Sequence, residues 1–78
     1  MLTPSQCRAA RGLLDWNQAA LAEATKLSVV TIRLFEKGGA TRDSNRNLIR
    51  LAFEKAGVQF IAENGGGAGV RLAKPAKD

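Results

Sequence analysis

The stretch QAALAEATKLSVVTIRLF, residues Gln18 to Phe35, decides the fold of this chain. Its apolar residues recur at the spacing of two short amphipathic helices joined by a tight turn, the pattern of a helix-turn-helix motif. Ala22 is small, so the two helix axes can approach closely where they cross. The positions expected to turn inward and fix the crossing angle are apolar: Leu21, Leu27, Ile32 and Phe35.

The second helix of this motif leaves a face exposed that carries Val29, Val30, Thr31 and Arg33. A helix exposed in this way can enter a DNA major groove. Valine side chains cannot donate hydrogen bonds, but they can pack on thymine methyl groups, and Arg33 can bind either a guanine or a phosphate. We therefore predict base contacts from Val29, Val30 and Arg33. Packing against another protein is the alternative for the two valines.

The positive charge of the chain is concentrated on and after this second helix. The net charge is +5, and residues 26–50 hold six basic and two acidic residues. A polyanion is the natural partner of such a segment, although solubilising charges on solvated faces would give the same count. Phosphate contacts would position the protein on DNA without reading the base sequence. The predicted phosphate contacts around this helix are Ser28, Thr31, Lys37, Thr41, Arg42 and Arg46.

The first three expected helices each begin at a capping residue: Thr3, Asn17 and Ser28. In the first helix, Pro4 suits the first helical position and Gln6 can close a capping box, and the helix should run to about residue 14. The second helix should end near residue 25, and the third near residue 37, where two glycines follow. The residues of the first helix expected to face inward are Cys7, Ala10, Leu13 and Leu14.

A fourth helix is expected to start at Asp43 or Ser44 as its cap and to end near residue 56. Its apolar residues form two adjacent stripes, which predicts burial against more than one surface. One stripe holds Leu48, Leu51, Ala52 and Lys55, and the other holds Ile49, Phe53 and Ala56.

The hydrophobic period changes after the fourth helix, and two short alternating segments predict a β-hairpin around a glycine-rich turn. A lone hairpin is only marginally stable, so it must cap the helical core or pair with the hairpin of a second chain. We expect a homodimer that uses Val58, Phe60, Val70 and Leu72. The expected division is a helical domain at 1–57, the hairpin of the same domain at 58–73 and a disordered tail at 74–78.

The composition argues against several classes of site. One cysteine excludes an intramolecular disulfide, and without histidine a transition-metal site is not expected. No nucleophile–base pair or carboxylate dyad is brought together by the pattern, and the run from Glu63 to Gly67 lacks the lysine of a phosphate loop, so neither an enzyme nor a cofactor is expected. Without a signal pattern or an apolar run of about 18 residues, the protein is expected in the cytoplasm, associated with the nucleoid, and not in a membrane.

Two motifs, W-N-Q-x-x-L-A at residues 16–22 and L-S-x-x-T-I-x-x-F-E-x-G at residues 27–38, resemble those of Cro/XRE-type regulators, the lambda-repressor-like DNA-binding domain family. The resemblance covers about residues 4–57. It implies a mainly α fold, a four-helix lambda-repressor-like helix-turn-helix domain, here followed by a short C-terminal β-hairpin. It also implies that Gln18 contacts the DNA backbone and braces the second helix of the motif.

The same resemblance implies a buried salt bridge between Arg11 and Glu36. Two positions depart from the family pattern. Lys26 stands in the turn where the family usually has glycine, and Thr25 stands where an apolar residue is common. A left-handed backbone at Lys26 would be costly but tolerable for one residue.

These observations predict a sequence-specific transcriptional regulator, expected to be a repressor, that binds an inverted repeat in double-stranded DNA as a homodimer. Its recognition helix would span about residues 28–37. The alternative is a protein-binding module, such as an antitoxin or antiactivator, whose toxin or activator partner docks on the recognition helix or the hairpin. RNA binding is less favoured because no aromatic stacking platform is evident.

Overall fold

Four helices followed by a two-stranded antiparallel hairpin make up the fold, which a computed structural model describes for residues 2–73. The elements are α1 (Pro4–Leu14), α2 (Gln18–Thr25), α3 (Val29–Glu36), α4 (Asp43–Lys55), β1 (Val58–Ile61) and β2 (Gly69–Leu72). The predicted class, mainly helical with a short C-terminal hairpin, is confirmed. The tail predicted at residues 74–78 lies outside the described residues.

The starts of the first three helices are fixed by the predicted capping residues. Thr3 forms a complete capping box with Gln6, and the side chains of Asn17 and Ser28 each accept a backbone hydrogen bond from the first turn of their helix. The prediction for the fourth helix is wrong, because Arg42 occupies the cap position without a side-chain hydrogen bond. Asp43 is instead the first helical residue, where its carboxylate suits the positive end of the helix dipole.

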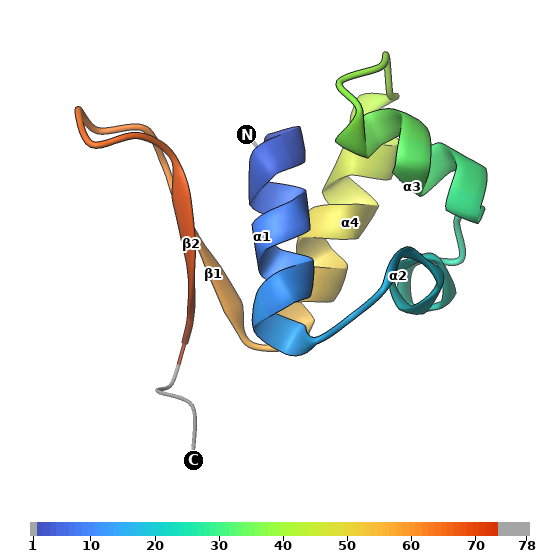
Figure 1. Cartoon of the computed structure of the whole chain (residues 1–78), viewed down its shortest axis with the longest axis horizontal. Coiled ribbons are helices and arrows are strands. Elements are labelled where there is room, and N and C mark those ends of the chain that lie inside the picture. Colours follow the sequence, from blue (N-terminus) through green and yellow to red (C-terminus); the bar gives the residue numbers. More distant parts are fainter. Residues whose placement is uncertain (1, 74–78) are drawn as a thin grey trace.

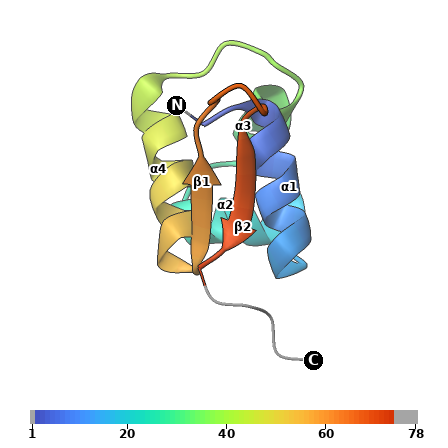
Figure 2. The same cartoon turned by 90° about the vertical axis from the view of Figure 1, so that its left-hand side faces the viewer.

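In the view of Figure 1, α1 and α4 lie between the hairpin and the pair formed by α2 and α3. The shorter helices α2 and α3 pack together on one side, and the hairpin covers the other. Seen from the hairpin side, β2 runs along α1 and β1 runs along α4 (Figure 2). The outer side of α3 is therefore left uncovered at the end of the molecule opposite the hairpin.

The core contains one of the two apolar stripes of α4. Ile49 and Phe53 are fully buried, whereas Leu48 and Leu51 are 43% and 48% exposed. The expected burial of α4 against more than one surface is confirmed, because the helix contacts both α2 and β1, but the side chains of Leu48 and Leu51 are not part of the buried surface. The same correction applies to Leu13 of α1, which is 40% exposed although it was expected to face inward.

The hairpin is joined to the helices by its apolar face and by one buried glutamine. Its register pairs Val58 with Leu72 and Phe60 with Val70, so all four side chains share one face. Val58 is buried and the other three pack against the core of their own chain. The hairpin was expected either to cap the helical core or to pair with a second chain. These four side chains cap the core, so their apolar surface is largely buried within their own chain. The side-chain amide of Gln6 also donates to the backbone carbonyls of Ile61 and Gly69, at 3.2 and 2.9 Å.

The turn between α2 and α3 is held by Thr25, one of the two departures from the family pattern. The Thr25 hydroxyl is buried, donates to the Leu21 carbonyl at 2.8 Å and accepts from the Leu27 backbone N–H at 3.3 Å. Threonine at this position therefore pairs the Leu27 backbone N–H, which an apolar side chain could not do. The next residue, Lys26, adopts the left-handed backbone with φ of 61°.

Replacing Lys26 by glycine is expected to raise the free energy of unfolding by roughly 0.5 kcal/mol, because glycine adopts positive φ without steric cost and this gain exceeds its entropy loss. The exposed ion pair with Glu23 that is lost contributes little. Urea unfolding followed by the fluorescence of Trp16 measures the change. Lys55→Gly, at a helical position of α4, is the control and should lower stability. A Lys26→Gly variant less stable than wild type would contradict the expectation.

Candidate functional site

The outward face of α3 is apolar at its centre. Ile32 and Phe35 are buried on the inner side, while Val30 and Leu34 on the outer side are 55% and 53% exposed. Arg33 is exposed beside them. Leu34 was not among the predicted contact residues, yet it follows Val30 by four positions and therefore shares its face. The helical spacing from Val30 was the signal that could have identified Leu34.

The first turn of α3 is used mainly by the fold. Val29, predicted as a base contact, is half-buried and packs against the core. The Ser28 hydroxyl accepts from the Thr31 backbone N–H at 3.0 Å and lies 2.9 Å from the Thr31 hydroxyl. These contacts hold the N-terminus of α3 in a fixed conformation, and they leave Val30 as the first fully outward side chain of the helix.

Several predicted phosphate contacts gather beside α3. The loop after the helix lies close against it, since the Gly39 backbone N–H donates to the Leu34 carbonyl at 2.9 Å, and a Cβ on Gly39 would collide with that oxygen. Lys37 is exposed at the end of α3. A shallow hollow next to the loop is lined by Thr31, Leu34, Ala40, Thr41, Arg42 and Asn45. The fold thus brings three of the predicted residues next to Leu34.

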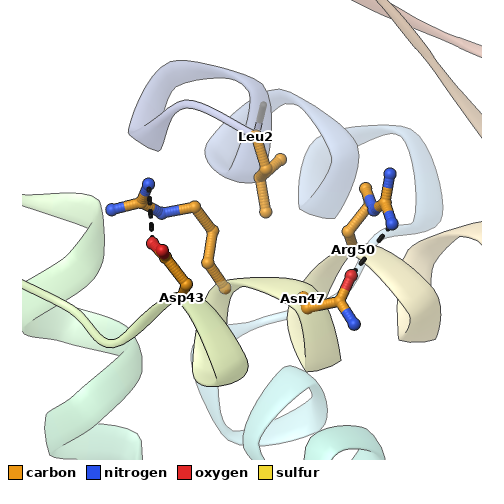
Figure 3. A pocket seen from close by; sticks show the side chains of 5 residues that line it. Leu2, Asp43, Asn47 and Arg50 are labelled. Carbon is orange, nitrogen blue, oxygen red and sulfur yellow. Dashed lines mark hydrogen bonds and ion pairs between the residues drawn. The ribbon is translucent and has the colours of Figure 1, made fainter.

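Arg46, also predicted as a phosphate contact, lies elsewhere. Its guanidinium is 5.7 Å from the centre of the Phe35 ring and 3.7 Å from the Asp43 carboxylate. A pocket between the start of the chain and α4 is lined by Leu2 and by four residues of α4: Asp43, Arg46, Asn47 and Arg50 (Figure 3). Arg46 lines a second hollow with Phe35, Gly38 and Gly39, whereas Thr41 and Arg42 line the hollow next to Leu34.

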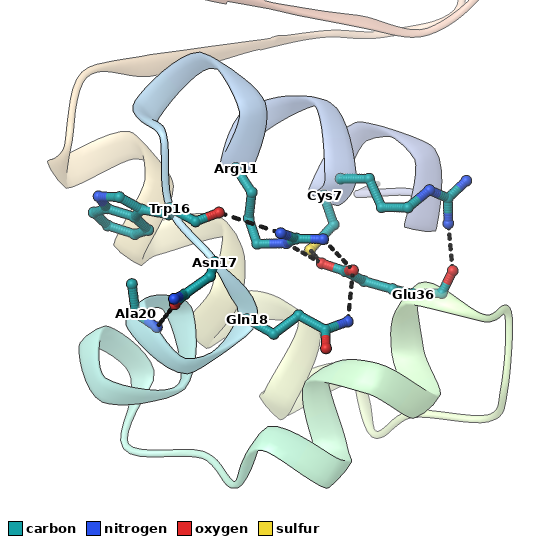
Figure 4. Close-up of polar contacts among 8 residues, drawn as sticks. Cys7, Arg11, Trp16, Asn17, Gln18, Ala20 and Glu36 are labelled. Carbon is teal, nitrogen blue, oxygen red and sulfur yellow. Dashed lines mark hydrogen bonds and ion pairs between the residues drawn. The ribbon is translucent and has the colours of Figure 1, made fainter.

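A buried carboxylate behind α3 joins three helices. Glu36, at the end of α3, accepts two hydrogen bonds of 2.7 Å from the Arg11 guanidinium of α1. It also accepts from the side-chain amide of Gln18 at 3.1 Å and from the Cys7 thiol at 3.2 Å (Figure 4). The Arg8 guanidinium donates to the Glu36 backbone carbonyl. The predicted pair of Arg11 and Glu36 is thus the centre of a larger network, in which Gln18 braces α3.

The charge of Glu36 is retained in this network. Burial raises the pKa of its carboxyl, but the hydrogen bonds from Arg11, Gln18 and Cys7 outweigh burial, so the pKa lies below its ordinary value. Burial, together with the hydrogen bond to Glu36, raises the pKa of the Cys7 thiol, which therefore stays protonated as a donor. The single carboxylate of α3 is thereby paired inside the protein and absent from its outer face.

Acid is expected to weaken the fold through Glu36. Because its folded-state pKa lies below the ordinary value of 4.5, the carboxylate contributes stability above that pH, and the contribution is lost as the pH falls through the lower, folded value. The urea concentration at which half of the protein is unfolded should therefore decrease once the pH is lowered below about 4.5. Backbone N–H groups of Gly67 and Gly65 also lower the pKa of the exposed Glu63, so Glu63→Gln serves as the control. This variant should still show most of the loss of stability that wild type shows in acid. An unchanged midpoint at about pH 3 would contradict this expectation.

Other kinds of site find little support within residues 2–73. No group of three histidine, cysteine or acidic side chains in this part of the chain is placed to hold a metal ion. None of the described helices is both long and apolar enough to cross a membrane. No protein-family model and no curated protein matches the chain. The features of the described residues that bear on function are the outward face of α3, the basic residues around it and the network that holds it.

Proposed function

We propose that this chain is a sequence-specific DNA-binding transcriptional regulator whose α3 is the recognition helix in the major groove. The observation that carries the proposal is the charge on the outer surface of α3 and the following loop. Arg33, Lys37 and Arg42 are exposed there, whereas Glu36 is buried against Arg11. Over residues 29–42 the exposed charged side chains are all positive, which suits the phosphate backbone that flanks a groove.

The network around Glu36 supports the proposal because it fixes α3 relative to α1 and α2 before binding. A recognition helix held in place loses little conformational entropy on entering a groove. Gln18 lies in this network at the N-terminus of α2, and the N-terminus of a helix favours a phosphate. We therefore assign Gln18, Ser28, Thr31, Lys37, Thr41 and Arg42 to phosphate contacts.

The proposal includes a lambda-repressor-like arrangement and a homodimer on an inverted repeat, with half-site centres roughly 34 Å apart. The hairpin is the candidate dimer element. Since its apolar face packs on its own core, pairing would use the unpaired backbone edge of β1 or β2. Repression by covering a promoter, in the cytoplasm at the nucleoid, is the simplest mechanism for such a regulator.

Selection from a randomised DNA pool at near-physiological salt tests the proposal. A palindromic consensus is expected, and Arg33→Ala should relax it at one base pair or weaken binding by about tenfold or more, since a good bidentate contact contributes roughly 1–3 kcal/mol. Arg71→Ala is the matched control, because Arg71 is an exposed arginine on the outer side of the hairpin, bonded to Gln59. Absence of an enriched sequence, or equal effects of the two substitutions, would refute recognition by α3.

A second candidate function is a protein-binding module, such as an antitoxin or antiactivator with a toxin or activator partner. The exposed aliphatic side chains of Val30 and Leu34 favour it. Salt discriminates between the two functions. A DNA complex that neutralises about six phosphates should lose roughly 10³-fold in affinity between about 50 and 200 mM salt, whereas an apolar protein interface should change little.

A further inference from the structure

The outward face of α3 presents two aliphatic side chains that the fold does not use. Val30 and Leu34 are each more than half exposed, and neither is among the apolar side chains packed on the core. They are four residues apart, so they lie on one side of the helix, about 6 Å apart along its axis. Exposing such a pair at the centre of a surface calls for a partner with matching apolar groups.

The surroundings of this pair are basic and hydroxylated. Arg33 and Arg42 are exposed near it, and the hollow beside Leu34 carries the hydroxyl-bearing side chains of Thr31 and Thr41. A stable protein interface buries about 800 Å² on each partner, and two aliphatic side chains inside a basic rim supply only a small part of that area. The charge complementarity therefore favours a polyanion that also offers small apolar groups.

The major groove of DNA is a surface of that kind. Its base edges present hydrogen-bond donors, acceptors and one apolar group, the C5-methyl of thymine. Val30 and Leu34 carry no hydrogen-bonding atom in their side chains, so methyl contact is the means by which they can distinguish bases. A 5-methylcytosine presents the same methyl group at the same ring position.

We propose that Val30 and Leu34 read pyrimidine C5-methyl groups, so that each half-site carries two methyl-bearing pyrimidines one or two base-pair steps apart. The spacing follows from their separation of about 6 Å along α3 and the roughly 3.4 Å rise of each base-pair step. This inference rests on the proposed DNA-binding function and specifies the groups that its recognition helix reads.

Removing single methyl groups from the selected operator tests the inference. Deoxyuridine keeps the base pairing of thymine but lacks the methyl, so affinity should fall about fourfold at the two contacted positions and nowhere else in the half-site. Leu34→Ala should abolish the penalty at one position, and Val30→Ala should abolish it at the other. At either position, wild type should bind 5-methylcytosine about fourfold more tightly than cytosine.

Leu51→Ala is the matched control, since Leu51 is 48% exposed on α4, and it should retain both deoxyuridine penalties. Circular dichroism confirms that each variant is folded. A wild type that tolerates deoxyuridine throughout, or alanine variants that keep both penalties, would overturn methyl reading while a palindromic consensus still upheld the proposed function. If the alanine variants bind every one of these DNAs with the affinity of wild type, methyl reading is overturned too. Val30 and Leu34 would then be assigned to a protein partner. If no DNA is enriched at all, both proposals fail.

Discussion

Replacing Glu36 by glutamine is expected to lower the free energy of unfolding by about 3–5 kcal/mol. The substitution removes the negative charge that the Arg11 guanidinium faces at 2.7 Å, and it leaves a cation whose side chain is only 19% exposed without its ion-pair partner. Native proteins have total stabilities of only about 5–15 kcal/mol, so the variant should lose a large part of its stability. Urea denaturation followed by circular dichroism measures the loss.

The exposed carboxylate Glu23 provides the control for Glu36. It pairs with Lys26 at 3.4 Å with both side chains more than 80% exposed, and Glu23→Gln should change stability by less than about 1 kcal/mol. In the double variant Arg11→Met, Glu36→Gln, part of the stability should return, because no unpaired charge remains. Similar losses for Glu23→Gln and Glu36→Gln would show that burial of the pair has no special effect.

Replacing Phe53 by alanine should cost about 3–5 kcal/mol, which is the usual effect of removing a buried aromatic ring. Phe53 is fully buried on α4, and its ring stacks on Trp16 at 5.8 Å and meets the edge of Phe60 at 6.0 Å. The ring therefore joins the connection between α1 and α2 to the hairpin. Its loss should lower the urea midpoint and weaken the packing of β1 on the helices.

Leu51→Ala on the same helix tests the burial argument, because Leu51 is about half exposed. Its effect should stay below about 1 kcal/mol, as is usual for surface positions. Trp16 is the only tryptophan, so its emission reports directly on the ring beside it, and circular dichroism provides an independent probe in the Phe53 variant. Equal losses at the two positions would contradict the assignment of Phe53 to the centre of the core.

The sequence alone determined the helix starts, because capping is a local interaction. The hydroxyl or amide of Thr3, Asn17 and Ser28 each reaches a backbone N–H three residues ahead, and no distant contact is needed. The position and length of the hairpin were also predictable from the change of hydrophobic period and from the glycine-rich turn. Arg42 is the exception among the caps, since its helix starts without any side-chain hydrogen bond.

Parts of the candidate site were also within reach of the sequence. The exposed valine at position 30 and the basic residues after α3 follow from helical spacing and composition. The proximity of Arg11 and Glu36 did not follow from either, and it was expected only from the resemblance to a family. Their separation of 25 residues is too long for any local pattern to specify.

The tertiary structure alone decided which apolar face is buried and which is left open. Leu48 and Ile49 are neighbours on one helix, but only Ile49 meets the core, because α2 and β1 pack against other parts of the α4 surface than the one that carries Leu48. The same long-range packing covers Val29 and leaves Leu34 outside. Composition cannot distinguish such residues, since burial depends on what other segments bring opposite them.

Tertiary packing also assigned the polar residues that join distant segments. Gln6 reads from the sequence as a capping residue, yet its amide also binds the hairpin more than 50 positions away. Cys7 reads as a small apolar residue, yet its thiol donates to Glu36. Local hydrogen bonds and the hydrophobic period thus determined the helices and strands. Contacts between groups far apart in the chain decided the core, the network behind α3 and the face that α3 presents, because only the folded backbone brings those groups within reach.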